Sequence, residues 1–287
     1  MAKIEHDVAI THSDRMYYPR DHITKLDVIE YYRVVASRLL AQIQKRPIVM
    51  QRFPEGIDGK SFYHKRVPPY FPAWIERIKI PLKDRTRATM GGLIINSVED
   101  LIYVVNQGCL VLHGWLSQKG SLNKPDKIVF DLDPGARVPF GQVKTVALAL
   151  KTELIACGLE PYVMVTGSRG VHVIVCIQPD KTFESMHAFA YNCAQAVEEK
   201  LPELITLSVR KKERDRRVFI DYLRNSYGQT SVVPYSLRAR DGAPVAMPVS
   251  WQELDEVTSA DFFTMKKAIK RILDGIDPWA DAHMLVV

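Results

Sequence analysis

Residues 127–134 read Lys-Ile-Val-Phe-Asp-Leu-Asp-Pro, a short hydrophobic run that ends in two aspartates and a proline. The run predicts a strand, in which successive side chains point to opposite faces. Asp131 and Asp133 are therefore expected on one face, with Cα atoms about 6.6 Å apart at ~3.3 Å per residue. Leu132 then points into the core. Pro134 ends the strand and leaves both carboxylates at a rim that a ligand can reach.

The chain on either side of this strand has a regular order of elements. We expect a helix over 140–157, strands over 161–166 and 171–177, a helix over 183–201, and a strand over 217–223. This β-α-β-β-α-β order is typical of ferredoxin-like, or split βαβ, folds. A further sheet segment is expected over 230–240, and a last helix over 261–274.

The N-terminal part alternates helices and strands as well. Thr24 and Asp27 resemble a capping box before a helix over 26–45, and Ser97 can cap a second helix over 98–106. Strands are expected over 47–53 and 109–115, and loop with short strands over 66–87. We therefore predict an α+β fold in one domain over 8–280. In it, an N-terminal α/β portion, about 8–126, packs on a catalytic RRM-like portion, about 127–280.

Composition narrows the class of protein. The chain has 287 residues, of which 47% are hydrophobic, so it can bury a substantial core. Its formal net charge of +6 favours an anionic partner. We find no apolar run of about 18 to 20 residues and no signal peptide, so we expect a cytoplasmic protein without a membrane partner. The four scattered cysteines form no C-x-x-C pair and are expected to be reduced thiols.

A third acid, Asp221, lies in the hydrophobic run 218–223, where a lone carboxylate is costly unless it is paired or bound to metal. In the split βαβ order this strand can lie beside the first, so Asp131, Asp133 and Asp221 are candidate ligands for one or two divalent ions. The alternative is an ordinary strand-end turn in which Asp221 pairs with Arg217 or Arg224. The residues alone leave both open.

Between two predicted strands lies Thr166-Gly167-Ser168-Arg169-Gly170-Val171-His172. The glycines permit a tight turn, the hydroxyls of Thr166 and Ser168 can donate hydrogen bonds, and Arg169 adds positive charge, so the loop is a candidate triphosphate cradle. It lacks the spacing of a Walker A loop, and the alternative is a generic Gly-rich hairpin. His172 and His113 are either structural residues or nucleotide contacts.

Basic and aromatic residues form three further groups. Residues 210–217 place six cations directly upstream of the third acid, and such a run is usually a solvated face. Arg238 and Arg240, on a predicted strand, are candidates for phosphate contacts or for a surface salt-bridge ladder. The stretch 62–66, Phe-Tyr-His-Lys-Arg, combines rings with cations as single-strand binding sites do, although one ring could equally belong to the core.

Taken in order, these motifs resemble the polymerase domain of bacterial ATP-dependent DNA ligase D, of the archaeo-eukaryotic primase superfamily. The resemblance extends over nearly the whole chain. It is carried by residues 62–65, 112–115, 131–134, 166–172, 219–225, 235–240 and 277–280.

The resemblance implies a template-directed polymerase that fills gaps and adds nucleotides at DNA ends during end joining. It implies Mn²⁺ or Mg²⁺ as cofactor, NTP or dNTP as substrate, a DNA end or gapped duplex with a 5′-phosphate, a Ku-type protein, and a separate or fused ligase. The metal ligands would be Asp131, Asp133 and Asp221. His113, Thr166, His172, Arg224 and Arg238 would hold the nucleotide, Arg15 and Lys25 the 5′-phosphate, and Phe62 and Tyr63, beside Lys65, the template base.

Two other functions fit part of the pattern. The same carboxylates could activate water in a metal-dependent phosphodiesterase or nuclease, although a triphosphate loop argues against this. A non-catalytic RRM-like module would place rings on its sheet, but three acids on the central strands would repel phosphates unless metal were bound.

Overall fold

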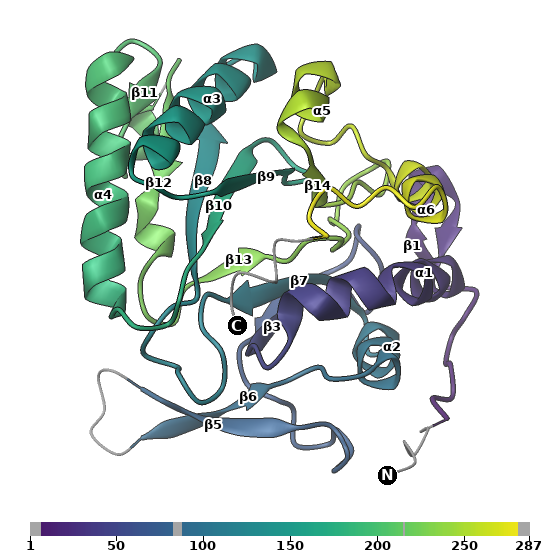
Figure 1. Ribbon diagram of the computed structural model, residues 1–287. Coiled ribbons are helices and arrows are strands. Elements are labelled where there is room, and N and C mark those ends of the chain that lie inside the picture. Colours follow the sequence, from purple (N-terminus) through teal and green to yellow (C-terminus); the bar gives the residue numbers. More distant parts are fainter. Residues whose placement is uncertain (1–6, 83–87, 215, 281–287) are drawn as a thin grey trace. The chain divides into compact units, whose positions relative to one another are not determined.

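The computed structural model describes residues 7–82, 88–214 and 216–280, which divide into two compact units (Figure 1). Among these residues, unit 1 takes those up to Trp115 together with Val232–Val245 and Thr264–Gly275. Unit 2 takes Leu116–Ser231, Ala246–Phe263 and those from Ile276 onward. Both units are thus assembled from segments that lie far apart in the sequence.

Unit 2 is built on a sheet with the strand order β11-β12-β8-β10-β9-β14. Only β11 and β12 pair in parallel; the other neighbouring strands are antiparallel. The first strand of the predicted β-α-β-β-α-β unit, β8, lies between β10 and β12, which confirms the predicted fold class. The strands are β8 (Lys127–Pro134), β9 (Pro161–Val165), β10 (Val171–Cys176), β11 (Ile205–Thr206), β12 (Val218–Asp221) and β14 (Met247–Val249).

Two long helices, α3 (Phe140–Ala156) and α4 (Phe183–Lys200), lie side by side against this sheet (Figure 1). α3 buries Val143, Val146, Ala147, Leu150 and Leu154, a set at helical spacing. Shorter elements complete the unit: the 3₁₀ turns η2 (Lys211–Glu213) and η3 (Tyr222–Arg224), and helix α5 (Trp251–Glu256). Both long helices were predicted within a residue of their ends.

Unit 1 contains a second sheet, with the order β7-β3-β6-β5 and with β4 paired to β3. The two-residue β2 pairs with β1 in a separate small ribbon. The strands are β1 (Met16–Tyr18), β2 (Ile23–Thr24), β3 (Ile48–Arg52), β4 (Phe62–His64), β5 (Arg77–Pro81), β6 (Thr89–Leu93), β7 (Cys109–Trp115) and β13 (Thr230–Val232), whose last residue belongs to this unit; η1 covers Pro19–Asp21.

The first two helices of unit 1 begin where their capping residues predict, whereas the last helix, predicted from residue 261, begins only at Met265. Thr24 accepts a hydrogen bond from the backbone of Asp27, whose side chain accepts one in return, at the start of α1 (Lys25–Ile43). Ser97 and Asp100 form the same box at the start of α2 (Val98–Asn106). These reciprocal bonds satisfy orphan backbone donors and fix where each helix starts.

Segments from late in the chain complete unit 1. The hydroxyl of Tyr31 on α1 donates to the carbonyl of Tyr235 at 2.7 Å, and the backbone N–H of Leu112 donates to Ser236 Oγ at 2.9 Å. Helix α6 (Met265–Leu273) contacts α1. Ser236 is fully buried, so these contacts belong to the core of the unit.

The prediction of a sheet segment over 230–240 is wrong beyond Val232. Residues 234–240 form turns and bends around one isolated bridge between Leu237 and Val245. Tyr235, inside this segment, has φ 66°, which a continuous strand does not tolerate. Arg238 and Arg240 therefore do not project from one face of a strand.

Within the described residues, no helix combines the length and apolar character needed to cross a bilayer.

Candidate functional site

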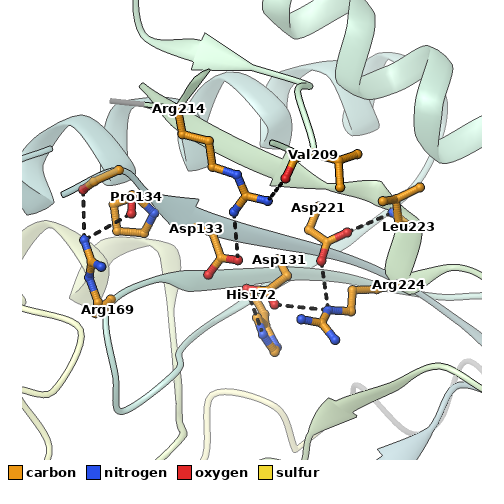
Figure 2. Close-up of polar contacts among 11 residues, drawn as sticks. Asp131, Asp133, Pro134, Arg169, His172, Val209, Arg214, Asp221, Leu223 and Arg224 are labelled. Atoms are coloured by element: carbon orange, nitrogen blue, oxygen red, sulfur yellow. Dashed lines mark hydrogen bonds and ion pairs between the residues drawn. The ribbon is translucent and has the colours of Figure 1, made fainter. Parts of the chain in front are cut away.

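The three predicted acids come together on neighbouring strands of unit 2 (Figure 2). Asp221 on β12 lies directly opposite Asp131 on β8, and His172 on β10 lies opposite Asp131 on its other side. One carboxylate oxygen from each of Asp131, Asp133 and Asp221 lies within 4.8 Å of the others. Strand register therefore creates the cluster, because residues in cross-strand pairs share a face of the sheet.

Two arginines and a histidine surround the cluster. Arg224 Nε lies 3.1 Å from Asp221 and 3.4 Å from Asp131, so one guanidinium is shared by two carboxylates. Arg214 Nη1 lies 3.8 Å from Asp133, and its guanidinium carbon lies 3.8 Å from the centroid of the Phe219 ring. The ion pair between Asp221 and Arg224 was the structural alternative considered for Asp221. In the structure that pair is part of a larger cluster.

The electrostatics of the cluster favour a further cation. Burial and the neighbouring carboxylate of Asp131 raise the pKa of Asp133 to about 6. Burial also raises the pKa of Asp221, although Arg224 opposes that shift. Because burial in this site raises the pKa of two of the carboxyl groups, a cation bound beside them would stabilise their charged forms.

The donor set fits a hard divalent ion. Carboxylate oxygens are the ligands that Mg²⁺ and Mn²⁺ favour in proteins. One oxygen of Asp221 is already oriented, because Oδ1 accepts a hydrogen bond from the backbone N–H of Leu223 at 3.1 Å. The carboxylates are therefore gathered and partly pre-oriented for a cation.

His172 is buried, with 3% of its surface exposed, and its Nε2 lies 3.3 Å from Asp131 Oδ1. Its Nδ1 is also buried and has no hydrogen-bond partner among the described residues. A buried ring nitrogen without a partner costs free energy, so this atom is suited to accept or donate a bond to a ligand.

The predicted triphosphate loop is held by a bond within the loop and by bonds to other segments of the chain. Thr166 Oγ1 donates to the carbonyl of Gly170 at 3.0 Å, and the backbone N–H of Gly167 donates to the carbonyl of Ala260 at 3.0 Å. Arg169 Nη2 donates to the carbonyls of Pro134 and Gly135 (Figure 2). The Arg169 side chain thus ties the loop to the end of β8.

Unit 1 brings together the two residues expected at a 5′-phosphate. The backbone N–H of Lys25 donates to the carbonyl of Arg15 at 2.8 Å. Lys25 is 3% exposed, and its Nζ donates to the carbonyl of Thr11 at 2.6 Å, while Arg15 Nη1 lies 2.9 Å from Glu55. Burial, and to a lesser degree the Arg15 cation, lower the pKa of Lys25 to about 8. An anion bound beside Lys25 would stabilise its protonated form and so oppose both the burial and the Arg15 charge.

Both rings of the predicted aromatic pair are exposed, Phe62 by 40% and Tyr63 by 58%, so neither belongs to the core. They lie on opposite faces of β4. Phe62 shares its face with His64, at 5.0 Å between ring centroids, whereas Tyr63 packs at 5.7 Å against His113. Lys65, directly after His64, is exposed.

The remaining predicted residues divide between the units. Unit 2 carries the aspartates, Ser168, His172 and Arg224, and Ser168 lies in the same loop as Thr166. His113 and Arg238 belong to unit 1 with the 5′-phosphate and aromatic groups. The backbone of Arg238 is fixed, because its N–H donates to Pro244 and its carbonyl accepts from the Tyr18 hydroxyl.

Sequence reasoning did not single out Arg214 from the basic run 210–217. Its neighbour Val209 accepts a hydrogen bond from Arg214 Nη2 at 3.0 Å, which directs the side chain toward Asp133. Acidic and basic residues follow one another in this run without a regular period, so no sequence signal separates this arginine from the others.

Comparison with known proteins identifies relatives over most of the chain. A family model described as LigD, primase-polymerase domain, matches residues 24–279. The multifunctional non-homologous end joining protein LigD of Mycolicibacterium smegmatis is 32% identical over 276 residues, which are 96% of this chain and 35% of the relative. The protein of the same name from Pseudomonas aeruginosa is 32% identical over 281 residues, which are 96% of this chain and 32% of the relative.

A solved structure agrees with this family. The polymerase domain from Mycobacterium tuberculosis ligase D in complex with DNA matches with a TM-score of 0.89 and 29% identity, covering 99% of this chain and 100% of that one. This chain spans about a third of the length of the first two curated relatives. The family model, the relatives and the fold agree, and the chain belongs to the LigD primase-polymerase domain family.

Proposed function

We propose that this chain is a template-directed nucleotidyltransferase that fills gaps and extends DNA ends during non-homologous end joining. The observation that carries the proposal is the carboxylate cluster of Asp131, Asp133 and Asp221, set on the central strands of a split βαβ sheet. Family membership supports the reaction class, and the DNA-bound state of the related Mycobacterium tuberculosis domain supports the substrate.

In this proposal the three aspartates hold divalent metal, Mn²⁺ in preference to Mg²⁺. The bound metal would lower the pKa of a primer 3′-hydroxyl and stabilise both oxygens of an in-line displacement. The contribution of the protein is to fix the ligands. Asp221 is oriented by the Leu223 amide, and Asp131 is oriented by His172.

The arginines and other polar side chains around the cluster are suited to a triphosphate. Arg224, His172, Ser168 and Arg169 in unit 2, with Thr166 shaping the loop, would bind and orient the incoming NTP or dNTP. The buried, partnerless Nδ1 of His172 supports its part in this role. For unit 1, His113 and Arg238 are proposed as nucleotide contacts.

The DNA contacts are proposed for unit 1. Arg15 and Lys25 would bind a downstream 5′-phosphate, and Phe62 and Tyr63, with Lys65, would contact the template strand. A Ku-type protein and a separate or fused ligase would be the protein partners. The place of action would be the cytoplasm, at the nucleoid during repair.

Primer extension tests the proposal directly. The substrate is a gapped duplex with a labelled primer and a 5′-phosphate, with Mn²⁺ and either rNTPs or dNTPs. Since metal contributes several kcal/mol to such reactions, Asp221→Asn should lower the rate about a thousandfold or more. The matched control is Asp255→Asn, at an exposed position on α5, which should leave the rate unchanged.

Three other results would contradict the proposal. Near-normal extension by Asp221→Asn would remove the carboxylates from the mechanism. Shortening of the primer in place of extension would indicate a metal-dependent nuclease. Metal-independent binding without turnover would indicate a non-catalytic module.

A further inference from the structure

Unit 1 carries a third exposed ring, that of Tyr70, which shares an arginine partner with Phe62. Tyr70, in the turn that follows β4, has 59% of its surface exposed. Its ring forms a T-shaped pair with the buried Phe71 ring, with 5.3 Å between the centroids. The Tyr70 ring therefore extends from the core into solvent, while its contact with Phe71 holds it in place.

A buried arginine joins Tyr70 to Phe62. Arg52, at the end of β3, is 9% exposed, and its Nη1 donates to the Tyr70 hydroxyl at 2.7 Å. The guanidinium carbon lies 5.6 Å from the centroid of the Phe62 ring. Arg52 and Phe62 are direct partners across the β3–β4 pair, so their side chains share a face.

The other edge of the guanidinium is fixed as well. Arg52 Nε donates to the carbonyl of Gln107 at 2.7 Å, at the end of α2. Because a guanidinium is planar and rigid, anchoring Nε and Nη1 sets the orientation of the whole group. One buried cation thus fixes the positions of two exposed rings, Phe62 and Tyr70.

This arrangement changes the partner of Phe62. The sequence pairs it with Tyr63, but Tyr63 lies on the opposite face of β4 with His113. On its own face, Phe62 has Arg52 and, through Arg52, Tyr70. The two rings that share an anchor are therefore eight residues apart in sequence.

Hydrophobic burial does not explain the exposed rings, since 40% of Phe62 and 59% of Tyr70 remain exposed to solvent. Rings held outward in a fixed geometry lose little entropy when a flat partner stacks on them. The exposed cations Lys65 and Arg66 follow β4 directly, and this combination of rings and positive charge suits single-stranded nucleic acid.

We propose that Phe62 and Tyr70, joined by Arg52, form a stacking platform for two successive unpaired bases of the template strand. Tyr70 binds the base that follows the one stacked on Phe62, and Arg52 is the positioning residue for both rings. The inference rests on the proposed function, since it assigns part of the DNA site of that polymerase.

Binding of the full chain to gapped duplexes tests the platform. The duplexes carry one or two unpaired template nucleotides, with 2-aminopurine at the first or second unpaired position. Stacking on an aromatic residue contributes about 1–3 kcal/mol per base, so Tyr70→Ala should weaken binding to the two-nucleotide gap roughly 5- to 150-fold. Binding to the one-nucleotide gap should stay unchanged, and quenching should be lost only at the second position.

Three variants separate stacking from structural effects. Tyr70→Phe keeps the ring but removes the bond to Arg52, so quenching should be partly restored relative to Tyr70→Ala. Arg52→Lys keeps the charge but loses the planar fork, and should reduce quenching at both positions. Tyr191→Ala removes an exposed ring on α4 of unit 2 and should bind both gaps like the parent protein.

Two outcomes distinguish a failure of the stacking platform from a failure of the proposed function. If the parent protein binds the gapped duplex and Tyr70→Ala binds the two-nucleotide gap equally well, the platform is wrong and the proposed function stands. If the parent protein binds neither duplex, the proposed function fails and the platform fails with it.

Discussion

Replacing Gly170 by alanine should damage the candidate site through the backbone of β8. A Cβ at Gly170 would lie 2.1 Å from the carbonyl oxygen of Leu132 and 3.2 Å from its carbonyl carbon. Ordinary contact distances are about 3.5 Å, so β8 or the loop must move by about 1 Å or more. Leu132 stands between Asp131 and Asp133, so this movement displaces the carboxylates directly.

The expected size of both effects follows from that displacement. Overpacking of this kind costs about 1–3 kcal/mol, which lowers Tm by roughly 2–12 °C for a protein of this size. A shift of about 1 Å at reacting groups lowers a rate about a hundredfold. Thermal unfolding followed by circular dichroism measures the first effect, and primer extension measures the second.

Gly141 provides the matched control. It lies in the first turn of α3, and a Cβ there would meet nothing within 4 Å. Gly141→Ala should therefore leave extension unchanged and keep or slightly raise Tm, because alanine favours helix. If Gly170→Ala matched the parent protein in both assays, the close approach of loop and strand would not constrain the site.

Three further predictions concern single residues. Asn225 Oδ1 accepts from the backbone N–H of Val129 and Nδ2 donates to its carbonyl, both at 2.8 Å, so Asn225→Ala should cost about 2–5 kcal/mol in urea unfolding; a loss below 1 kcal/mol would contradict this. The preference for a 5′-phosphate over a 5′-hydroxyl should weaken as pH rises through about 8, because Lys25 loses its proton, and Lys25→Gln should show no such pH dependence in anisotropy titrations. In protein treated with a chelator, the raised pKa of Asp133 means that the folded state binds more protons than the unfolded state between about pH 4 and 6. This difference stabilises the folded state below about pH 4, and the stabilisation is lost as pH rises through about 6. If the free energy of unfolding of Asp133→Asn depended on pH as that of the parent protein does, this assignment to Asp133 would be refuted.

Local rules predicted most of the elements around the site. The period of two in 127–134 placed Asp131 and Asp133 on one face, and the split βαβ order placed the strand of Asp221 beside them. The capping box at Thr24 predicted the start of α1. These features depend on neighbours in sequence or on one simple topology, so the residues are sufficient to predict them.

Long-range contacts account for most of the structural features that the sequence did not predict. The role of Arg169 at a triphosphate stays a prediction, whereas the bonds of its guanidinium to the end of β8, between residues about 35 positions apart, were not predicted. The pairing of Phe62 with Tyr70 depends on where the buried side chain of Arg52 points, which strand alternation alone does not reveal. Helix α5 was missed although Ser250 and Glu253 form a capping box that the sequence does display.

The two late segments of unit 1 have a consequence for synthesis and folding. Residues 232–245 and 264–275 supply partners for α1 and β7, including the Ser236 hydroxyl that binds the Leu112 amide. During translation these partners emerge after more than a hundred residues of unit 2 have left the ribosome. Unit 1 therefore cannot be completed until Gly275 has been made, although its first helix is made early, and a fragment ending at residue 126 would expose part of its core to aggregation.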